Sequence, residues 1–208
     1  MTVNVTMTVP ARRLLLTASV LACLGALSAC DKPAPPPSFK ALDITGAEYA
    51  SKLALTDANG QPFQLSSLKG KVAVVFFGYT QCPDVCPTTL TSLAETQRLL
   101  GKDGDKLVGV FVTVDPKRDT AALMKSYVGA FHPQWVGLRG SPEETAAAAK
   151  EFKIFYREVP GKTESSYTVD HTAASFVFDP QGKVRLYVRH ATPAADLAAD
   201  IQVLLANP

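Results

Sequence analysis

This sequence of 208 residues has little charge and few of the residues that react as nucleophiles or bind soft metals. Charged residues make up 19% of it, the formal net charge is +2, and no long run of lysines or arginines occurs. A nucleic-acid partner, which requires a dense basic face, is therefore not expected. There are only four cysteines and three histidines, whereas 47% of the residues are apolar, enough to bury a core.

No apolar run near the N-terminus is long enough to make a clear membrane-spanning helix. Arg12 and Arg13 precede an apolar stretch at 14–27, which is shorter than the roughly 20 residues that a spanning helix needs. Basic, apolar and small residues in this order are typical of a bacterial signal peptide. The ending LSAC resembles a lipobox, so residues 1–29 are predicted to be a lipoprotein signal peptide and Cys30 the lipidated residue. The alternatives are an uncleaved anchor and an ordinary signal that is cleaved nearby.

A lipidated Cys30 would place the protein outside the cytoplasm and on a membrane. Asp31 resembles the signal that keeps Gram-negative lipoproteins on the inner membrane, so the expected location is its periplasmic face. Residues 30–38 are rich in proline and predict a stiff tether, after which residues 39–208 are expected to form one domain.

The signal peptide also reduces the number of cysteines that can act in the domain. Cys23 would leave with the peptide and Cys30 would take the lipid. Only Cys82 and Cys86 remain, and they would work in an oxidising compartment.

The order of the predicted elements is typical of a thioredoxin-like α/β domain, a central mixed sheet flanked by helices. Two continuous apolar runs rich in β-branched and aromatic residues predict strands buried on both faces, each followed by a helix. An antiparallel pair of strands and a last helix complete the pattern. Strands are predicted at residues 52–56, 62–65, 72–79, 107–114, 135–138, 174–178 and 184–188, and helices at about 87–100, 120–129, 141–152 and 193–205.

Cys82 and Cys86 lie where the first central strand meets its helix, the place at which this kind of fold carries reactive residues. Pro87 suits the first turn of a helix, so Cys86 is expected at or just before the helix start and Cys82 in the loop before it. Free backbone N–H groups and the positive helix end favour thiolate over thiol. The pair is therefore expected to be available as a nucleophile or as a soft metal ligand.

Three interpretations of this pair follow from the residues alone. A structural disulfide would close a small ring and stabilise the fold only modestly. A redox pair is compatible with the position, although the thioredoxin spacing C-x-x-C is one residue shorter. One form of the redox interpretation, a peroxide-reducing enzyme, would need one nucleophilic cysteine in a different threonine and proline context. A metal site would need further ligands, because two sulfurs are an incomplete set.

The three histidines are the candidates for a third ligand. His132 precedes a proline in an apparent loop, so a surface position is expected for it. His190 follows the last strand at an expected helix entry, so a surface or capping role is expected for it. His171 lies in a loop that a thioredoxin-like sheet can bring beside the first strand, but a packed loop histidine fits equally well. Two thiolates and one imidazole suit Cu(I), and they can hold Cu(II) with another oxygen ligand. Structural zinc normally takes four protein ligands, and no fourth is evident.

Most of the chain, nearly all of residues 40–206, resembles the Sco (SenC) family of copper chaperones for cytochrome c oxidase. The resemblance implies a thioredoxin-like fold with a hairpin or loop insertion that carries His171. It also implies copper as the bound metal, held by Cys82, Cys86 and His171, and a redox-active disulfide between the two cysteines. The segments that carry the resemblance are GKVAVVFFGYTQCPDVCPTTL at 70–90, TVDPKRDT at 113–120 and VDHTAASFVFDPQGKV at 169–184.

The same resemblance implies roles for two carboxylates. Asp84, between the cysteines, and Asp115 match recurring positions of the family and are expected to tune the site. For Asp115 the alternative is a loop carboxylate that caps a helix after Pro116.

The function implied is that of a metallochaperone, a binding protein rather than an enzyme, which delivers copper to the Cu-A centre of cytochrome c oxidase subunit II. The alternative is a thiol–disulfide reductase that keeps the cysteines of that centre reduced, and copper storage or redox sensing is a third interpretation. The implied partners are subunit II, an upstream periplasmic copper donor or thiol reductant, and the membrane through the lipid anchor. Both main functions need Cys82 and Cys86, but only copper binding needs His171.

Overall fold

The computed structural model describes residues 1–4, 37–163 and 166–207. Cys23, Cys30, most of the predicted signal peptide and most of the predicted tether lie outside these residues. From Ser38 onwards the described residues form one compact unit. No helix within the described ranges combines the length and the apolar character needed to cross a bilayer.

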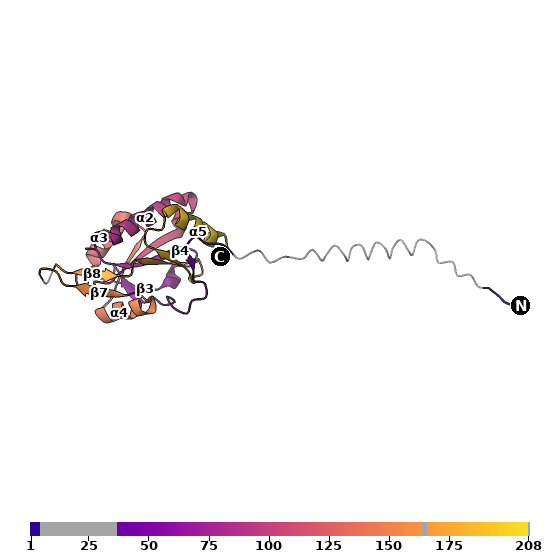
Figure 1. Ribbon diagram of the computed structural model, residues 1–208, viewed down its shortest axis with the longest axis horizontal. Coiled ribbons are helices and arrows are strands. Elements are labelled where there is room, and N and C mark those ends of the chain that lie inside the picture. Colours follow the sequence, from indigo (N-terminus) through magenta and orange to yellow (C-terminus); the bar gives the residue numbers. More distant parts are fainter. Residues whose placement is uncertain (5–36, 164–165, 208) are drawn as a thin grey trace. The chain divides into compact units, whose positions relative to one another are not determined.

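An eight-stranded mixed sheet forms the centre of this unit (Figure 1). Its two middle strands, β4 (Val72–Gly78) and β5 (Leu107–Thr113), run parallel, and every residue in both is buried. Burial on both faces is what their continuous apolar runs predicted. The strand order is β1-β10-β9-β4-β5-β6-β2-β3. The other strands are β1 (Leu42–Asp43), β2 (Leu55–Asp57), β3 (Pro62–Phe63), β6 (Val136–Arg139), β9 (Ala174–Phe178) and β10 (Val184–Arg189).

Helices cover both faces of the sheet, which confirms the predicted thioredoxin-like plan. Three of them lie on one face, α2 (Val85–Leu99), α3 (Ala121–Phe131) and α5 (Ala194–Ala206), while α4 (Pro142–Glu151) lies on the other (Figure 1). Two short 3-10 helices, η1 (Leu65–Leu68) and η2 (Gly101–Lys106), complete the set.

The first residue of α2 differs from the prediction. The helix begins at Val85 with Asp84 as its N-cap, so Cys86 lies inside the first turn rather than at or before the start. The reason is a helical hydrogen bond from the Thr88 N–H to the Asp84 carbonyl, 3.1 Å long, which closes a turn around Pro87. Proline is tolerated there because the first N–H groups of a helix have no partner within it.

A separate two-stranded sheet carries His171. Its strands are β7 (Tyr156–Val159) and β8 (Thr168–His171), antiparallel, with Tyr156 opposite His171. In Figure 1 this hairpin extends beyond one end of the main sheet. The sequence indicated an insertion here but not its strands, because β7 and β8 are mostly exposed and show no long apolar pattern.

Candidate metal centre

Ligand atoms from two distant parts of the chain meet beyond the end of β4. One atom each from Cys82, Cys86 and His171 lies within 4.8 Å of the other two. Cys86 Sγ and His171 Nε2 are 3.4 Å apart. Cys86 is buried, the other two residues are half-buried, and both cysteines are free thiols. The structure therefore brings together all three residues that the resemblance named as copper ligands.

The two cysteines occupy different positions around the start of α2. Cys82 lies in the loop, where its N–H donates to the Tyr79 carbonyl across 3.2 Å, and Cys86 is the second residue of the helix. The Cys86 N–H donates to Cys82 Sγ across 3.4 Å. A helix N-terminus thus supplies an unpaired backbone donor to the sulfur of the loop cysteine, which favours its thiolate.

A glycine at the end of β4 makes room for the buried thiol. A Cβ atom at Gly78 would lie 2.6 Å from Cys86 Sγ and 2.9 Å from Cε2 of Phe111. Both distances are too short for contacts between unbonded atoms, so a larger residue at 78 would displace Cys86 or the strand. Gly78 is therefore part of what places this sulfur.

The thiols also differ in acidity. The hydrogen bond from the Cys86 thiol is the main cause that lowers the pKa of Cys82 from 9.0 to about 4, and burial only partly opposes it. The contact with His171 and backbone donors act in the same direction. The same bond to Cys82, together with burial, raises the pKa of Cys86. At neutral pH the pair without metal is therefore one thiolate, on Cys82, and one thiol.

The ring of His171 is oriented by its neighbours. It packs edge-on against the rings of Phe76 and Tyr79, with centroids 5.9 and 6.0 Å away. Its Nδ1 lies 3.2 Å from the carbonyl oxygen of Thr172. A carbonyl only accepts hydrogen bonds, so this contact places the proton on Nδ1 and leaves the Nε2 lone pair facing Cys86. A neutral imidazole with its other nitrogen bonded in this way is the usual form of a metal ligand.

The two predicted tuning carboxylates lie in different places. Asp84 is exposed, accepts a hydrogen bond from the Thr88 hydroxyl at 3.2 Å, and lines the open hollow that also contains Cys82 and His171. Asp115 is buried, pairs with Arg118, and does not line this hollow. It does not cap a helix either, because α3 begins at Ala121 with Thr120 as its N-cap. That alternative for Asp115 was wrong.

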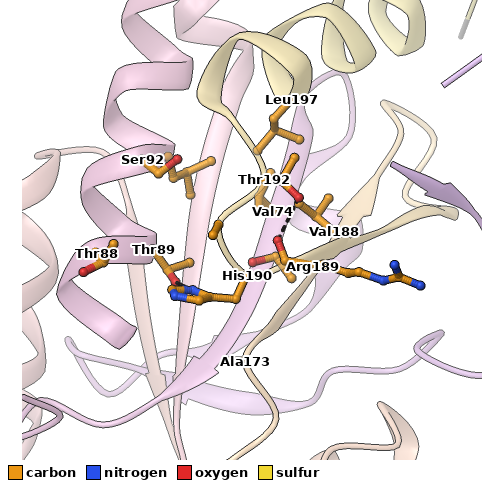
Figure 2. A pocket seen from close by; sticks show the side chains of 13 residues that line it. Val74, Thr88, Thr89, Ser92, Ala173, Val188, Arg189, His190, Thr192 and Leu197 are labelled. Atoms are coloured by element: carbon orange, nitrogen blue, oxygen red, sulfur yellow. Dashed lines mark hydrogen bonds between the residues drawn. The ribbon is translucent and has the colours of Figure 1, made fainter. Parts of the chain in front are cut away.

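The other two histidines stay away from the cluster. His132 stacks on Trp135, with ring centroids 5.7 Å apart, and contacts the side chain of Gln97. His190 is exposed, and its Nδ1 lies 3.3 Å from the Thr89 hydroxyl at a separate small pocket beside α2 (Figure 2). Neither belongs to the metal-binding group. His190 is on the surface as expected, whereas His132 is half-buried because its ring packs on Trp135.

Some residues around the centre were not singled out by the sequence. Asp119 is buried and accepts hydrogen bonds from the N–H and hydroxyl of Thr80, in the loop before Cys82. Arg118 contacts both this loop and the segment before β8. The only signal for either was membership of the segment TVDPKRDT, which does not indicate what the side chains contact.

Comparison with known proteins covers most of the domain. The model of the SCO1/SenC family matches residues 43–206. The SCO2-like protein of Rickettsia felis is 38% identical over 137 residues, which are 65% of this chain and 65% of that protein. The mitochondrial SCO2 homolog of Mus musculus is 35% identical over 151 residues, 72% of this chain and 59% of that protein. This chain thus spans less than two thirds of the length of these relatives.

Matches to solved structures cover a larger share of both chains. The structure of Bradyrhizobium japonicum ScoI with copper bound is 42% identical, with a TM-score of 0.66, and the match covers 73% of this chain and 96% of that one. Apo Sco1 from Thermus thermophilus is 36% identical, with a TM-score of 0.71, over 82% of this chain and 99% of that one. Yeast Sco1 with copper bound is 28% identical, with a TM-score of 0.68, over 83% and 91%.

Proposed function

Because this chain belongs to the SCO1/SenC family, we propose that it binds copper through Cys82, Cys86 and His171 and delivers it to the Cu-A centre of cytochrome c oxidase subunit II. The observation that carries the proposal is the convergence of two sulfurs and one imidazole nitrogen within 4.8 Å. Relatives with solved structures contain copper, namely those from Bradyrhizobium japonicum and yeast. The donor set is soft, as Cu(I) prefers, and no fourth ligand of the kind found in structural zinc sites joins it among the residues that the structure describes.

The partial exposure of two of the ligands is compatible with a copper ion that is bound and then transferred to another protein. Cys86 is buried, whereas Cys82 and His171 are half-buried and line an open hollow. Incoming ligands of a target protein can therefore reach the metal from the side of Cys82 and His171. Binding displaces the proton of Cys86, so copper affinity is expected to rise with pH.

The first prediction concerns the third ligand. In His171→Ala, the affinity for Cu(I) should fall by about 100-fold or more, since even residues that only orient a metal ligand are worth about 10–100-fold. Competition with a chromophoric Cu(I) chelator measures it. His190→Ala is the matched control, because that histidine is exposed and outside the cluster, and it should bind like the original protein. Equal affinity in His171→Ala would remove His171 from the site.

Delivery is tested by transfer. The protein loaded with one equivalent of Cu(I) is mixed with a reduced, copper-free subunit II domain, and the copper in each protein is measured after separation. Copper should move to subunit II. If it stays on this protein while chelators remove it readily, delivery is contradicted and storage is favoured.

The difference in pKa between the two thiols favours a second candidate function, thiol–disulfide reduction. The Cys82 thiolate would attack a target disulfide and form a mixed disulfide, releasing one target thiolate. Cys86, after losing its proton, would attack Cys82 Sγ, release the second target thiol and leave a Cys82–Cys86 disulfide. The target gains two electrons and the pair loses two. This reaction does not use His171 as a metal ligand, so it should survive His171→Ala while copper binding does not.

Alkylation by iodoacetamide measures this asymmetry. Because the pKa of Cys82 is lowered to about 4, its reaction rate should stay nearly constant from about pH 8 to pH 5 and fall below about pH 4. An ordinary thiol, with a pKa near 8.5, slows about tenfold per unit over the same range. Mass spectrometry should place the label on Cys82 rather than buried Cys86. A steady tenfold decrease per pH unit would contradict the thiolate assignment.

We also propose that Cys30 is lipidated and holds the protein on the periplasmic face of the inner membrane, as its lipobox-like sequence indicates. Expressed in a Gram-negative host, the protein should sediment with inner membranes and incorporate labelled palmitate. Cys30→Ser should lose the label and the processing at this site. The Cys23→Ser control should behave like the original protein, since residue 23 is removed with the signal peptide. Unchanged labelling of Cys30→Ser would overturn the proposal.

A further inference from the structure

We infer that Arg118 is a positioning residue, which sets the location of His171 relative to the two cysteines by holding Tyr167 at the base of the β7–β8 hairpin. This inference rests on the proposed copper function, since its consequence is the geometry of the copper ligands. It starts from the contacts of one guanidinium group.

Arg118 contacts each of the segments that surround the metal centre. Its side chain is 13% exposed, and its Nε donates to Oδ2 of Asp115, whose side chain is 1% exposed. Its Nη1 donates to the carbonyl oxygen of Tyr167 at 2.8 Å and to Oε1 of Gln81 at 3.2 Å. The guanidinium carbon lies 3.5 Å from the centroid of the Tyr167 ring and 5.6 Å from that of Tyr79.

These contacts join three parts of the chain. Asp115 follows β5, Gln81 directly precedes Cys82, and Tyr167 directly precedes β8. The Tyr167 hydroxyl also donates to Oδ1 of Asp115, 2.8 Å away. A guanidinium presents its donors in a rigid planar fork, so simultaneous contacts with several partners fix their relative positions. We refer to Asp115, Arg118 and Tyr167 as the hairpin clamp.

The hairpin needs such a clamp because, among the described strands, none of the main sheet pairs with it, and it contacts that sheet through side chains such as His171 on Phe76. β7 and β8 pair only with each other, as a sheet separate from the eight-stranded one. An isolated two-stranded hairpin is marginally stable in water, so its placement depends on side-chain contacts with the rest of the protein. Tyr167 adjoins the first residue of β8 and His171 is the last, so a displacement of Tyr167 is transmitted along one short strand.

Other ion pairs at the hairpin cannot do the same. Lys117 and Glu158 also link it to the domain, across 2.7 Å, but their side chains are 63% and 51% exposed. Exposed pairs contribute little. Arg157 and Asp170 pair within the hairpin and are exposed, so they cannot place it against the domain. Arg157 is therefore the matched control for Arg118.

Two variants weaken the clamp without removing the charge that faces Asp115. Arg118→Lys keeps a cation near this buried carboxylate but loses the planar fork. Tyr167→Leu removes the half-buried ring and its hydroxyl and leaves the Arg118–Asp115 pair intact. Both proteins are therefore expected to fold, which circular dichroism checks. Arg157→Lys serves as the control variant.

Hydrogen exchange of the copper-free proteins tests the clamp directly. Amides of residues 168–171 should exchange at least about tenfold faster in Arg118→Lys and Tyr167→Leu, because the hairpin opens more often, whereas amides of β4 and β5 should not change. In competition with bicinchoninate, affinity for Cu(I) should fall by about 10–100-fold in both variants. Arg157→Lys should change neither quantity. Unchanged exchange and affinity in both clamp variants would overturn the inference.

A double variant shows whether Arg118 acts through His171. In the His171→Ala background, Arg118→Lys should cause no further loss of affinity for Cu(I), because the residue that it positions is absent. A further loss as large as in the original protein would show that Arg118 acts independently of His171 and would overturn the inference. If the original protein does not bind Cu(I), the proposed function fails, and hydrogen exchange alone then decides whether the clamp exists.

Discussion

Replacing Cys86 with serine should leave the fold intact and remove nearly all affinity for Cu(I). Cys86 is fully buried in the first turn of α2, and its Sγ lies 3.4 Å from His171 Nε2. Serine has the same shape with a smaller atom, and its hydroxyl can hydrogen bond to the same imidazole. The substitution replaces a soft thiolate ligand with a neutral hydroxyl, which is a poor ligand for Cu(I). We expect the affinity for Cu(I) to fall by more than about 100-fold. A residue that only orients a metal ligand is worth about 10–100-fold, and Cys86 is itself a ligand.

The same substitution should leave the pKa of Cys82 low, because a serine hydroxyl can donate to the Cys82 sulfur as the Cys86 thiol does. Copper competition together with pH-dependent alkylation therefore separates the loss of a ligand from a loss of the Cys82 thiolate. Thr96→Ser is the matched control, since it removes one methyl group from another buried position of α2 and no ligand. The assignment of Cys86 as a ligand fails if Cys86→Ser retains one Cu(I) with unchanged affinity.

The second large effect is expected on stability, in Asp119→Ala. The Asp119 carboxylate is fully buried and accepts hydrogen bonds from the Thr80 N–H at 3.1 Å, the Thr80 hydroxyl at 2.6 Å and the Thr113 hydroxyl at 2.5 Å. Alanine leaves these donors without that acceptor, so the free energy of unfolding should fall by about 3 kcal/mol or more. For a domain of this size that corresponds to a decrease in Tm of about 6–12 °C.

Thermal unfolding followed by circular dichroism measures this effect. Glu95→Ala is the control, because it removes a carboxylate from an exposed pair with Arg98, and its Tm should change little. Thr80 begins the loop that carries Cys82, so Asp119→Ala should also bind copper more weakly at temperatures where it is folded. An unchanged Tm would show that other groups accept the hydrogen bonds of Thr80 and Thr113 in the variant.

The sequence predicted the elements whose pattern lies in consecutive residues. The apolar runs at 72–79 and 107–114 became β4 and β5 almost to the residue, because a strand buried on both faces needs an apolar side chain at every position. Ser141 with Glu144 forms the capping box that begins α4. The start of α2 was placed too late, since Pro87 suits more than one position of a first helical turn.

For the candidate centre, the sequence indicated the two cysteines by local chemistry, and the family resemblance indicated His171. The residues alone left His171 open, because a histidine 85 residues after Cys86 has no local pattern that indicates what it faces. The hairpin was also missed as secondary structure. Its strands are short and mostly exposed, so they lack the alternation that predicts a strand.

Sequence patterns were sufficient to predict the buried central strands, the thiol pair at the start of a helix and the family to which the chain belongs. These properties depend on neighbouring residues or on similarity along the whole chain. The three-dimensional fold was needed to show that Cys86 is buried beside Gly78, that His171 directs Nε2 at it, and that Asp115 pairs with Arg118 instead of capping a helix. Those properties depend on which distant side chains share a space, and packing across the whole domain decides that.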